Sequence, residues 1–332
     1  MRFPSNLDLR SPRPDRFPSM EFPPLDFRRI RTYPLRERDH KVHRRQLAHP
    51  WQKGESFARF LESMPDILAG QDFRAVVAAT VNAVRNGKPV VLMMGAHPIK
   101  CGLSPVLIGM MKRGILSAVA FNGAAAIHDF ELALIGATSE DVQHGLDDGS
   151  FGMIDETGRL MNQAMAAGVQ QGIGAGRALG QAILQGPFPN KDLSLLHQGV
   201  LDKVPVTVHI AIGTDIIHQH PAAAGAVLGE ASYLDFQTFA AVVARLQGGV
   251  VLNVGSAVIM PEVFLKALTI ARNLGHVVDE FTAVTFDMIR HYRPAENVVR
   301  RPTTRGGQGY YLIGHHELLV PLWAAAVQEH LG

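Results

Sequence analysis

From about residue 55 onward, short apolar runs alternate with amphipathic patterns, and no other feature of this chain constrains its fold as much. Such runs, rich in Val, Ile and Ala, are typical of strands buried on both faces of a sheet. Between them, apolar residues recur at spacings of three and four, which predicts helices. The sequence therefore predicts an α/β fold, with a mostly parallel open sheet and helices on both of its faces. The predicted strands are residues 89–94, 117–121, 204–212, 249–254, 276–284 and 310–313.

A glycine-rich block at residues 157–184 invites a second interpretation, because a dinucleotide-binding loop also spaces its glycines closely. Such a loop follows a strand directly, whereas Gly172, Gly174 and Gly176 follow a helical pattern. We therefore predict one helical block over 157–184, with small residues that let neighbouring helices approach closely.

Residues 1–54 differ from the rest of the chain and are predicted to form an extended arm. Eight of the twenty prolines fall within residues 1–50, together with twelve Lys or Arg against six Asp or Glu. This density of proline rules out a long helix. The interspersed acids Asp8, Asp15, Glu21 and Asp26 argue against an organelle transit peptide. We predict an arm that docks within an oligomer, followed by a single α/β domain over residues 55–332.

The balance of charge limits the classes of binding partner, and the cysteine content limits the cellular compartment. A formal net charge of only +2 favours small-molecule or protein partners over nucleic acid or an anionic membrane. No apolar stretch reaches the roughly 20 residues that a membrane-spanning helix needs. Cys101 is the only cysteine, so no internal disulfide can form, which suits a reducing compartment. The start of the chain lacks the apolar core of a secretory signal. A cytoplasmic location is predicted.

The loops that follow the predicted strands are the candidate site. In an open parallel sheet, ligands bind beyond the carboxyl ends of the strands, where loops and helix N-termini meet. Five such segments combine a glycine with titratable or hydroxyl side chains, as expected where a loop approaches a ligand closely. We expect them to converge on one site. They are residues 95–102, 122–129, 213–221, 255–256 and 314–317.

Four motifs, in order along the chain, carry a resemblance to one enzyme family. Residues 122–129, Asn-Gly-Ala-Ala-Ala-Ile-His-Asp, resemble the family's Thr-Ala-Gly-Gly-Val-Glu-Glu-Asp segment. Val-Pro-Val at 204–206 with Thr-Asp at 214–215 is similar to its Ile-Pro-Val and Thr-Asp-Gly-Ser segment. Residues 250–255 stand where the family has Ile-Ile-Leu-Gly-Gly-Gly, and residues 318–323 resemble its terminal Leu-Val-Phe-Pro-Leu helix. From about residue 88 to 330, the chain resembles the deoxyhypusine synthases.

This resemblance implies an NAD-binding fold and a homotetramer, a dimer of dimers with active sites near subunit interfaces. Members of that family oxidise spermidine with NAD and pass its aminobutyl group through an enzyme lysine to an acceptor amine. His128 falls where the family has a glutamate near the reaction centre, and it is our preferred general base. The candidate catalytic residues are His128, Lys100 and Asp215. The implied cofactor contacts are Gly95, Ala96, His97, Asn122, Gly123, Ala124, Thr214, Asp215, Gly255 and Ser256.

Two departures from the family pattern change the predicted chemistry. The family's covalent lysine has no counterpart, because Val258 stands at its position and valine cannot form an imine. The acidic segment that receives the polyamine is replaced by residues 287–294, which contain Arg290 and Arg293 and favour a different, anionic substrate. We therefore predict an NAD-dependent enzyme that abstracts a hydride from a small amine or polar substrate, and not a true deoxyhypusine synthase.

Two alternatives stay open at this point. His218 and His220, with Asp215 and the pair His128-Asp129, could supply metal ligands for a hydrolase, although no helical His-Glu-x-x-His pattern supports this and no metal site is predicted. The other alternative is a binding protein that kept the NAD pocket and lost catalysis. Lys100 suits contact with a phosphate better than a covalent role.

Three further features each have a structural and a functional interpretation. Asp129 is as suited to helix capping as to catalysis. The basic segment at 300–309 is either an anion-binding loop or a surface turn. Cys101 is better explained as an inert thiol than as a reactive one.

Overall fold

The computed structural model describes residues 21–332. The chain divides into two units between His43 and Arg44. In the smaller unit, the described residues form two short 3-10 helices, η1 (Phe27–Arg29) and η2 (Leu35–Glu37), and none of their side chains is buried. Asp26 caps η1 by accepting a hydrogen bond from the Arg28 N–H. Asp8 and Asp15, which bear on the predicted arm, lie outside the described residues.

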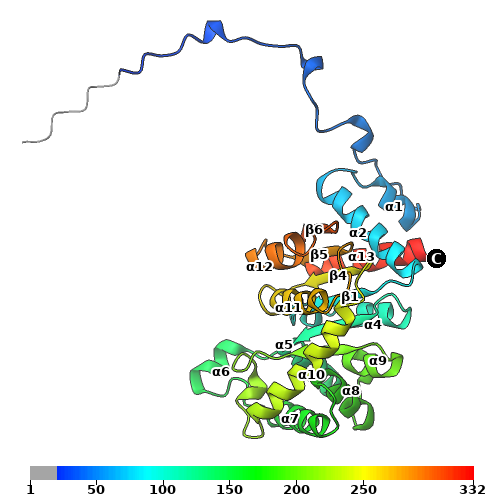
Figure 1. Ribbon diagram of the computed structural model, residues 1–332, viewed down its shortest axis with the longest axis vertical. Helices are drawn as coiled ribbons and strands as arrows, with labels where there is room; N and C mark the ends of the chain where they lie inside the picture. Colours follow the sequence, from blue (N-terminus) through cyan, green and yellow to red (C-terminus); the bar gives the residue numbers. More distant parts are fainter. Residues whose placement is uncertain (1–20) are drawn as a thin grey trace, which may run out of the picture. The chain divides into compact units, whose positions relative to one another are not determined.

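The larger unit contains a six-stranded sheet in which every strand is parallel to its neighbours, so the predicted α/β fold class is confirmed. The strand order is β3-β2-β1-β4-β5-β6, of which Figure 1 labels β1, β4, β5 and β6. Five strands overlap their predicted positions closely, whereas β5 begins six residues after the predicted start at 276. The strands are β1 (Val90–Met94), β2 (Ala118–Asn122), β3 (Val206–His209), β4 (Val250–Val254), β5 (Thr282–Asp287) and β6 (Gln308–Ile313).

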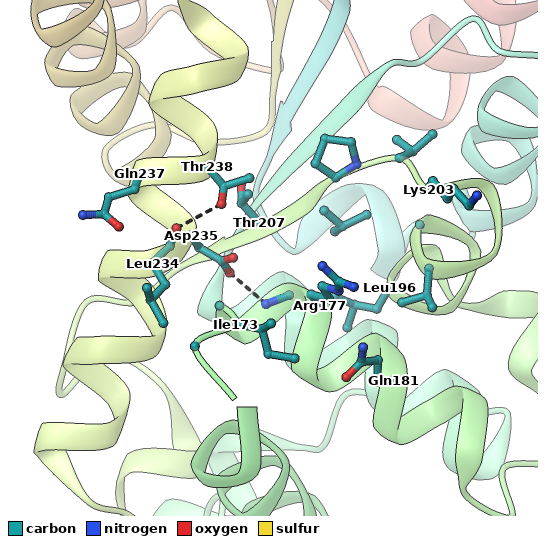
Figure 2. A pocket seen from close by; sticks show the side chains of 18 residues that line it. Ile173, Arg177, Gln181, Leu196, Lys203, Thr207, Leu234, Asp235, Gln237 and Thr238 are labelled. Atoms are coloured by element: carbon teal, nitrogen blue, oxygen red, sulfur yellow. Dashed lines mark hydrogen bonds between the residues drawn. The ribbon is translucent and has the colours of Figure 1, made fainter. Parts of the chain in front are cut away.

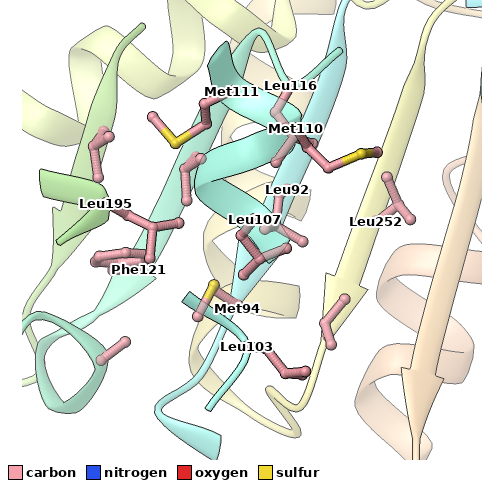
Figure 3. Packing of buried hydrophobic residues seen from close by; sticks show 14 of the residues in the cluster. Leu92, Met94, Leu103, Leu107, Met110, Met111, Leu116, Phe121, Leu195 and Leu252 are labelled. Atoms are coloured by element: carbon pink, nitrogen blue, oxygen red, sulfur yellow. The ribbon is translucent and has the colours of Figure 1, made fainter. Parts of the chain in front are cut away.

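Helices cover both faces of the sheet, as predicted. Alternate residues of each strand face opposite sides, so Leu92 and Met94 join one apolar cluster while Val91 and Met93 join the other. Figure 3 shows Leu92 and Met94 packed against Leu107 of α4. The helices on this face are α2 (Leu68–Arg85), α4 (Ser104–Lys112), α5 (Gly123–Ile135), α8 (Ala175–Gln185), α9 (Leu195–Asp202) and α13 (His316–Leu331).

The opposite face is covered by fewer elements. The C-terminal part of α10 (Gly225–Val243) and all of α11 (Ile259–Asn273), both labelled in Figure 1, pack there with the π-helix η6 (Ala295–Arg300). The remaining elements of this unit are mostly short, and some of them, such as α7, add buried residues to the first cluster. They are η3 (Arg44–Gln46), α1 (Phe57–Ser63), α3 (His97–Lys100), α6 (Val142–Asp148), α7 (Asp155–Gln170), η4 (Lys191–Leu193), η5 (Ile216–His218) and α12 (Tyr292–Pro294).

The predicted single helical block at 157–184 is wrong, because the structure divides it into α7 and α8. Gly172 lies between them with φ +68°, a left-handed conformation that ends α7 without the strain that a side chain would add. The predicted close approach of neighbouring helices is confirmed at Gly180 of α8, where a Cβ atom would lie 2.4 Å from the carbonyl oxygen of Leu196 in α9. A Cβ atom on Gly176 would lie 1.9 Å from the carbonyl oxygen of Val206, so α8 touches the backbone of β3.

Asp141 caps α6 by accepting hydrogen bonds from the N–H groups of Gln143 and His144. Among the described residues, no helix has both the length and the apolar character needed to cross a bilayer.

Candidate functional site at the carboxyl edge of the sheet

Because all six strands are parallel, their carboxyl ends lie along one edge, and the predicted loops gather there. Strands β2 and β3 lie on one side of β1, and strands β4, β5 and β6 lie on its other side. The crevice between the ends of β1 and β4 is therefore a topological switch point, the place where ligands bind in open α/β sheets. The loop at residues 95–97 follows β1, and the loop at 255–256 follows β4.

Three predicted cofactor glycines make room for other parts of the protein. A Cβ atom on Gly95 would lie 2.3 Å from the carbonyl oxygen of Gly255, and one on Gly123 would lie 2.0 Å from Oδ2 of Asp215. Gly255 has φ +63°, and a Cβ atom there would lie 2.8 Å from the His316 ring. These glycines therefore bring Asp215 and His316 to the switch-point edge.

His128 lies in the second turn of α5, and its ring is held by two neighbours. The Thr138 hydroxyl donates to Oε2 of Glu131 at 2.5 Å, so its oxygen is left to accept from Nδ1–H of His128 at 2.6 Å. Glu131 also accepts a hydrogen bond from Thr157 at 3.0 Å. The neutral His128 tautomer thus carries its proton on Nδ1, which leaves Nε2 as the basic nitrogen.

Burial lowers the pKa of His128, and the nearby Lys100 ammonium lowers it further, while Glu131 opposes them. At neutral pH the imidazole is therefore unprotonated and can accept a proton. The structure brings together the two predicted catalytic residues His128 and Lys100, from the loop after β1 and the helix after β2. The oriented chain Glu131–Thr138–His128 was not predicted. The only signal in the sequence was the spacing of three residues between His128 and Glu131.

Asp215 and His218 form a second buried pair after β3. Nδ1 of His218 accepts from the N–H groups of Gly213 at 3.1 Å and Asp215 at 3.3 Å, so its proton is on Nε2. This Nε2 lies 3.9 Å from Oδ2 of Asp215, and neither atom has a hydrogen-bond partner. Burial raises the pKa of Asp215 to about 6 and lowers that of His218. The carboxylate therefore keeps one buried oxygen, Oδ2, without a hydrogen bond.

His316, at the start of α13, adds a third group to this edge. Its Nε2 donates to the carbonyl oxygen of Phe286 at 3.1 Å, which leaves the buried Nδ1 without a partner. Asn253 and Thr285 are register partners on β4 and β5, and each also keeps one buried oxygen without a hydrogen bond. Unpaired buried polar atoms are rare in folded proteins. Sequence reasoning overlooked Asn253 and Thr285, although both are polar residues inside apolar strands.

Other candidate residues take part in the fold. Asp129 accepts hydrogen bonds from the Ser194 hydroxyl and from the N–H groups of Leu195 and Leu196, so it caps α9. Burial raises its pKa to about 6. His220 lies 3.4 Å from Asp155 on α7, whereas His218 contacts its own loop, so these two histidines do not face one ligand.

The basic segments are paired with acids. Arg300 and Arg301 both contact Glu296, and Arg305 lies 3.5 Å from Asp279. The segment at 300–309 runs from the end of η6 to the start of β6. In the segment at 287–294, Arg293 lies 3.5 Å from Glu262. Arg290 lies over the Tyr311 ring, with 5.3 Å between Cζ and the ring centroid.

One group with metal-ligand geometry occurs in the described part of the chain. Ligand atoms of His97, Cys101 and Glu317 all lie within 4.8 Å of one another. The pKa of the Cys101 thiol is raised by burial and by the neighbouring Glu317, so the thiol is protonated at neutral pH. The set suggested by the sequence, built on His218 and His220, is not among the groups with this geometry.

A cavity of about 720 Å³ lies away from this edge, along the outer side of β3 (Figure 2). Its lining includes Arg177 and Gln181 of α8, Lys203 after α9 and Asp235 of α10. Asp235 is buried and accepts from the N–H groups of Gly176 and Val208, and burial raises its pKa to about 7. No pattern in the sequence indicated this cavity.

Comparison with known proteins found similar structures but no similar sequences. No protein-family model and no curated protein matches the chain. A conserved putative LOR/SDH protein from Methanococcus maripaludis S2 is 16% identical over 79% of this chain and 70% of its own, with a TM-score of 0.48. AgrE, solved with ornithine and NAD+, is 12% identical over 80% of this chain, with a TM-score of 0.48.

A third solved structure, a putative deoxyhypusine synthase from Entamoeba histolytica, is 9% identical over 84% of this chain and 95% of its own, with a TM-score of 0.47. The chain spans about a third of the length of AgrE, 34%. At these identities and TM-scores the likeness carries no functional argument.

Proposed function

We propose that this protein is an NAD-dependent enzyme that takes a hydride from a small amine or polar substrate at the carboxyl edge of its sheet. The observation that carries the proposal is the strand order β3-β2-β1-β4-β5-β6 with every strand parallel. That order is the doubly wound arrangement that binds dinucleotides where the strand order reverses. The resemblance to the deoxyhypusine synthases supports the same cofactor.

The residues along this edge fit a dinucleotide chemically. The unpaired Oδ2 of Asp215 can accept a hydrogen bond from a ribose hydroxyl, and the exposed Lys100 can neutralise a phosphate. Backbone groups at Gly95, Ala96 and His97, at Asn122, Gly123 and Ala124, and at Thr214, Gly255 and Ser256 are the other proposed contacts. A metal-dependent hydrolase built on His218 and His220 is not proposed, because these residues face different neighbours.

The side chain proposed to act on the substrate is His128. When bound, NAD supplies the hydride acceptor. Nε2 of His128 then takes the proton that an amine or hydroxyl group loses as its carbon gives up the hydride, and Thr138 and Glu131 fix the ring. Val258 is 50% exposed at the start of α11 and cannot form an imine. We therefore exclude transfer through a lysine there and give Lys100 a phosphate-binding role.

A non-catalytic NAD-binding protein is the alternative, and a single series of measurements separates the two. Calorimetric titration with NAD+ should show binding, weakened at least tenfold in Asp215→Ala and unchanged in Asp148→Ala, a surface control on α6. NADH absorbance is then followed with a panel of small amines and hydroxyl compounds, and His128→Gln should lose turnover while it keeps NAD+ binding.

Each failure has a distinct meaning. Absence of NAD+ binding at millimolar concentration would remove the proposal altogether. Binding without NADH formation from any compound of the panel would favour the non-catalytic alternative. Assembly as a dimer of dimers with sites near subunit interfaces, and a cytoplasmic location, also belong to this proposal.

A further inference from the structure

A second ligand-binding arrangement lies at the rim of the same edge, and it uses the side chain of His97, whereas the proposed NAD contact of this residue is through its backbone. His97 and Cys101 stand four residues apart across the short helix α3, where the Cys101 N–H bonds the His97 carbonyl at 2.9 Å. Residues four apart in a helical turn share one face. Glu317, in the first turn of α13, reaches the same point from 216 residues further along the chain.

The three side chains are held in place by their surroundings. Pro98 and Ile99 of α3 are buried, and the His97 ring meets the His316 ring edge to face, with 5.3 Å between their centroids. Sγ of Cys101 lies 3.6 Å from Oε2 of Glu317. No hydrogen bond of the His97 imidazole occurs within residues 21–332 of the structure. The ligand atoms therefore converge with little of their bonding capacity used.

We propose that His97, Cys101 and Glu317 bind a divalent transition-metal ion, with zinc as the best match. Their ligand atoms lie within 4.8 Å of one another, close enough for a single ion to reach all three at the usual bond lengths of about 2.0–2.3 Å. One thiolate, one imidazole and one carboxylate form a mixed set that suits Zn²⁺, whereas Mg²⁺ and Ca²⁺ prefer oxygen alone.

The charge of the set supports the same ion. Binding of the ion displaces the proton of the Cys101 thiol to solvent. The resulting thiolate and the Glu317 carboxylate carry two negative charges, which balance the charge of a divalent cation. Three protein ligands leave a fourth position of a tetrahedral ion for water or another molecule, as in catalytic rather than structural zinc sites. His97 and Glu317 are exposed and Cys101 is half-buried, so an ion can reach the site from solvent.

The test is a titration of the metal-free, untagged full-length protein with Co²⁺ and no nucleotide. Cobalt bound to a thiolate gives a charge-transfer absorption in the near ultraviolet, and tetrahedral cobalt gives intense visible bands. We expect both, saturating at one ion per chain and reversed by Zn²⁺. Cys101→Ser should lose the charge-transfer band, and His97→Gln and Glu317→Gln should each weaken binding at least tenfold. His144→Gln, an exposed histidine on α6, is the matched control.

Two results would overturn the proposal. One is saturation with Co²⁺ without a thiolate band. The other is an affinity for Zn²⁺ that stays within twofold of wild type in Cys101→Ser, because that would place the ion on other histidines. Circular dichroism shows whether each variant is folded, and these three residues are exposed or half-buried, so their loss leaves the core intact. Since no nucleotide is present, failure here says nothing about NAD, and failure to bind NAD says nothing about the metal.

Discussion

At the scale of single residues, the surroundings of the His128 imidazole give the most direct test of the proposed site. Burial and the Lys100 ammonium both lower its pKa. Lys100→Met removes the charge and keeps the length of the side chain, so the pKa of His128 should rise. Histidine resonances followed by NMR across pH 4–8 measure this. An unchanged His128 titration would mean that the two side chains are not close enough to act on one substrate.

A second histidine links a single residue to the stability of the whole chain. His209, at the end of β3, is buried beside Phe239, and burial lowers its pKa to about 3. In the unfolded chain this pKa is about 6.5, so between about pH 6.5 and pH 3 the unfolded state binds the extra proton. Stability is therefore retained above about pH 6.5 and lost as the pH falls below it.

The size of this effect can be measured by substitution. Relative to His209→Gln, the wild-type chain should lose roughly 2 kcal/mol of unfolding free energy between pH 7 and pH 5. Glutamine can keep the hydrogen bond with Thr207. Urea unfolding of both proteins at the two pH values gives the difference. Equal losses in the two proteins would show that His209 is not buried as a neutral ring.

At the scale of elements, two helical glycines give opposite expectations for the same substitution. Gly176 in α8 touches the backbone of β3, since a Cβ atom there would lie 1.9 Å from the Val206 oxygen. A backbone atom cannot move aside cheaply, so Gly176→Ala should lower the free energy of unfolding by about 2 kcal/mol or more. Gly109 in α4 has no atom within 4 Å of its Cβ position. Gly109→Ala should therefore raise stability by up to about 1 kcal/mol.

Chemical denaturation of both variants tests this pair. A small loss of unfolding free energy in Gly176→Ala would mean that α8 and β3 can separate, and the cavity beside Asp235 would then be able to change shape.

The break between α7 and α8 also explains why the sequence was misinterpreted at residues 157–184. From the sequence alone, a glycine that ends a helix cannot be distinguished from a glycine that lies inside a helix and packs against a strand.

Most elements could be predicted because their signals are local. The apolar run at 250–254 is buried along its whole length, and a β-strand forms there. The start of the strand at 276–284 was misplaced, because Val278 fills the core on the α11 side before the strand begins at Thr282. At the site, the loops could be placed on one edge from the fold class alone. The Glu131–Thr138–His128 chain and the meeting of Cys101 with Glu317 depend on tertiary contacts that no spacing reveals.

At the scale of the whole molecule, the strand order is what the sequence left undetermined. A parallel sheet with helices on both faces follows from the alternation of patterns, but many orders satisfy it. The order that forms places β1 and β4 side by side, joined by register pairs from Val90–Val250 to Met94–Val254. The loops after β1 and β4, which are more than 150 residues apart in the sequence, therefore lie at one crevice. Loop motifs that are weak signals individually form the candidate site together.

The arm provides the last prediction at this scale. None of residues 21–43 is buried, and the division into two units falls after His43. Removing residues 1–43 should therefore change the free energy of unfolding of the α/β unit by less than about 1 kcal/mol. If this segment docks on another subunit, as its proline content and basic charge led us to propose, the same deletion should weaken assembly. Sedimentation velocity of both proteins over a range of concentrations measures this.

The two readouts separate the possible roles of the arm. A stable, folded deletion variant that sediments as a smaller species would support docking between subunits. Unchanged sedimentation of a full-length oligomer would contradict it, because the subunit contacts would then lie wholly within residues 44–332. A large loss of unfolding free energy in the dissociated chain would instead place part of the arm against its own α/β unit, since only contacts within one subunit survive dilution.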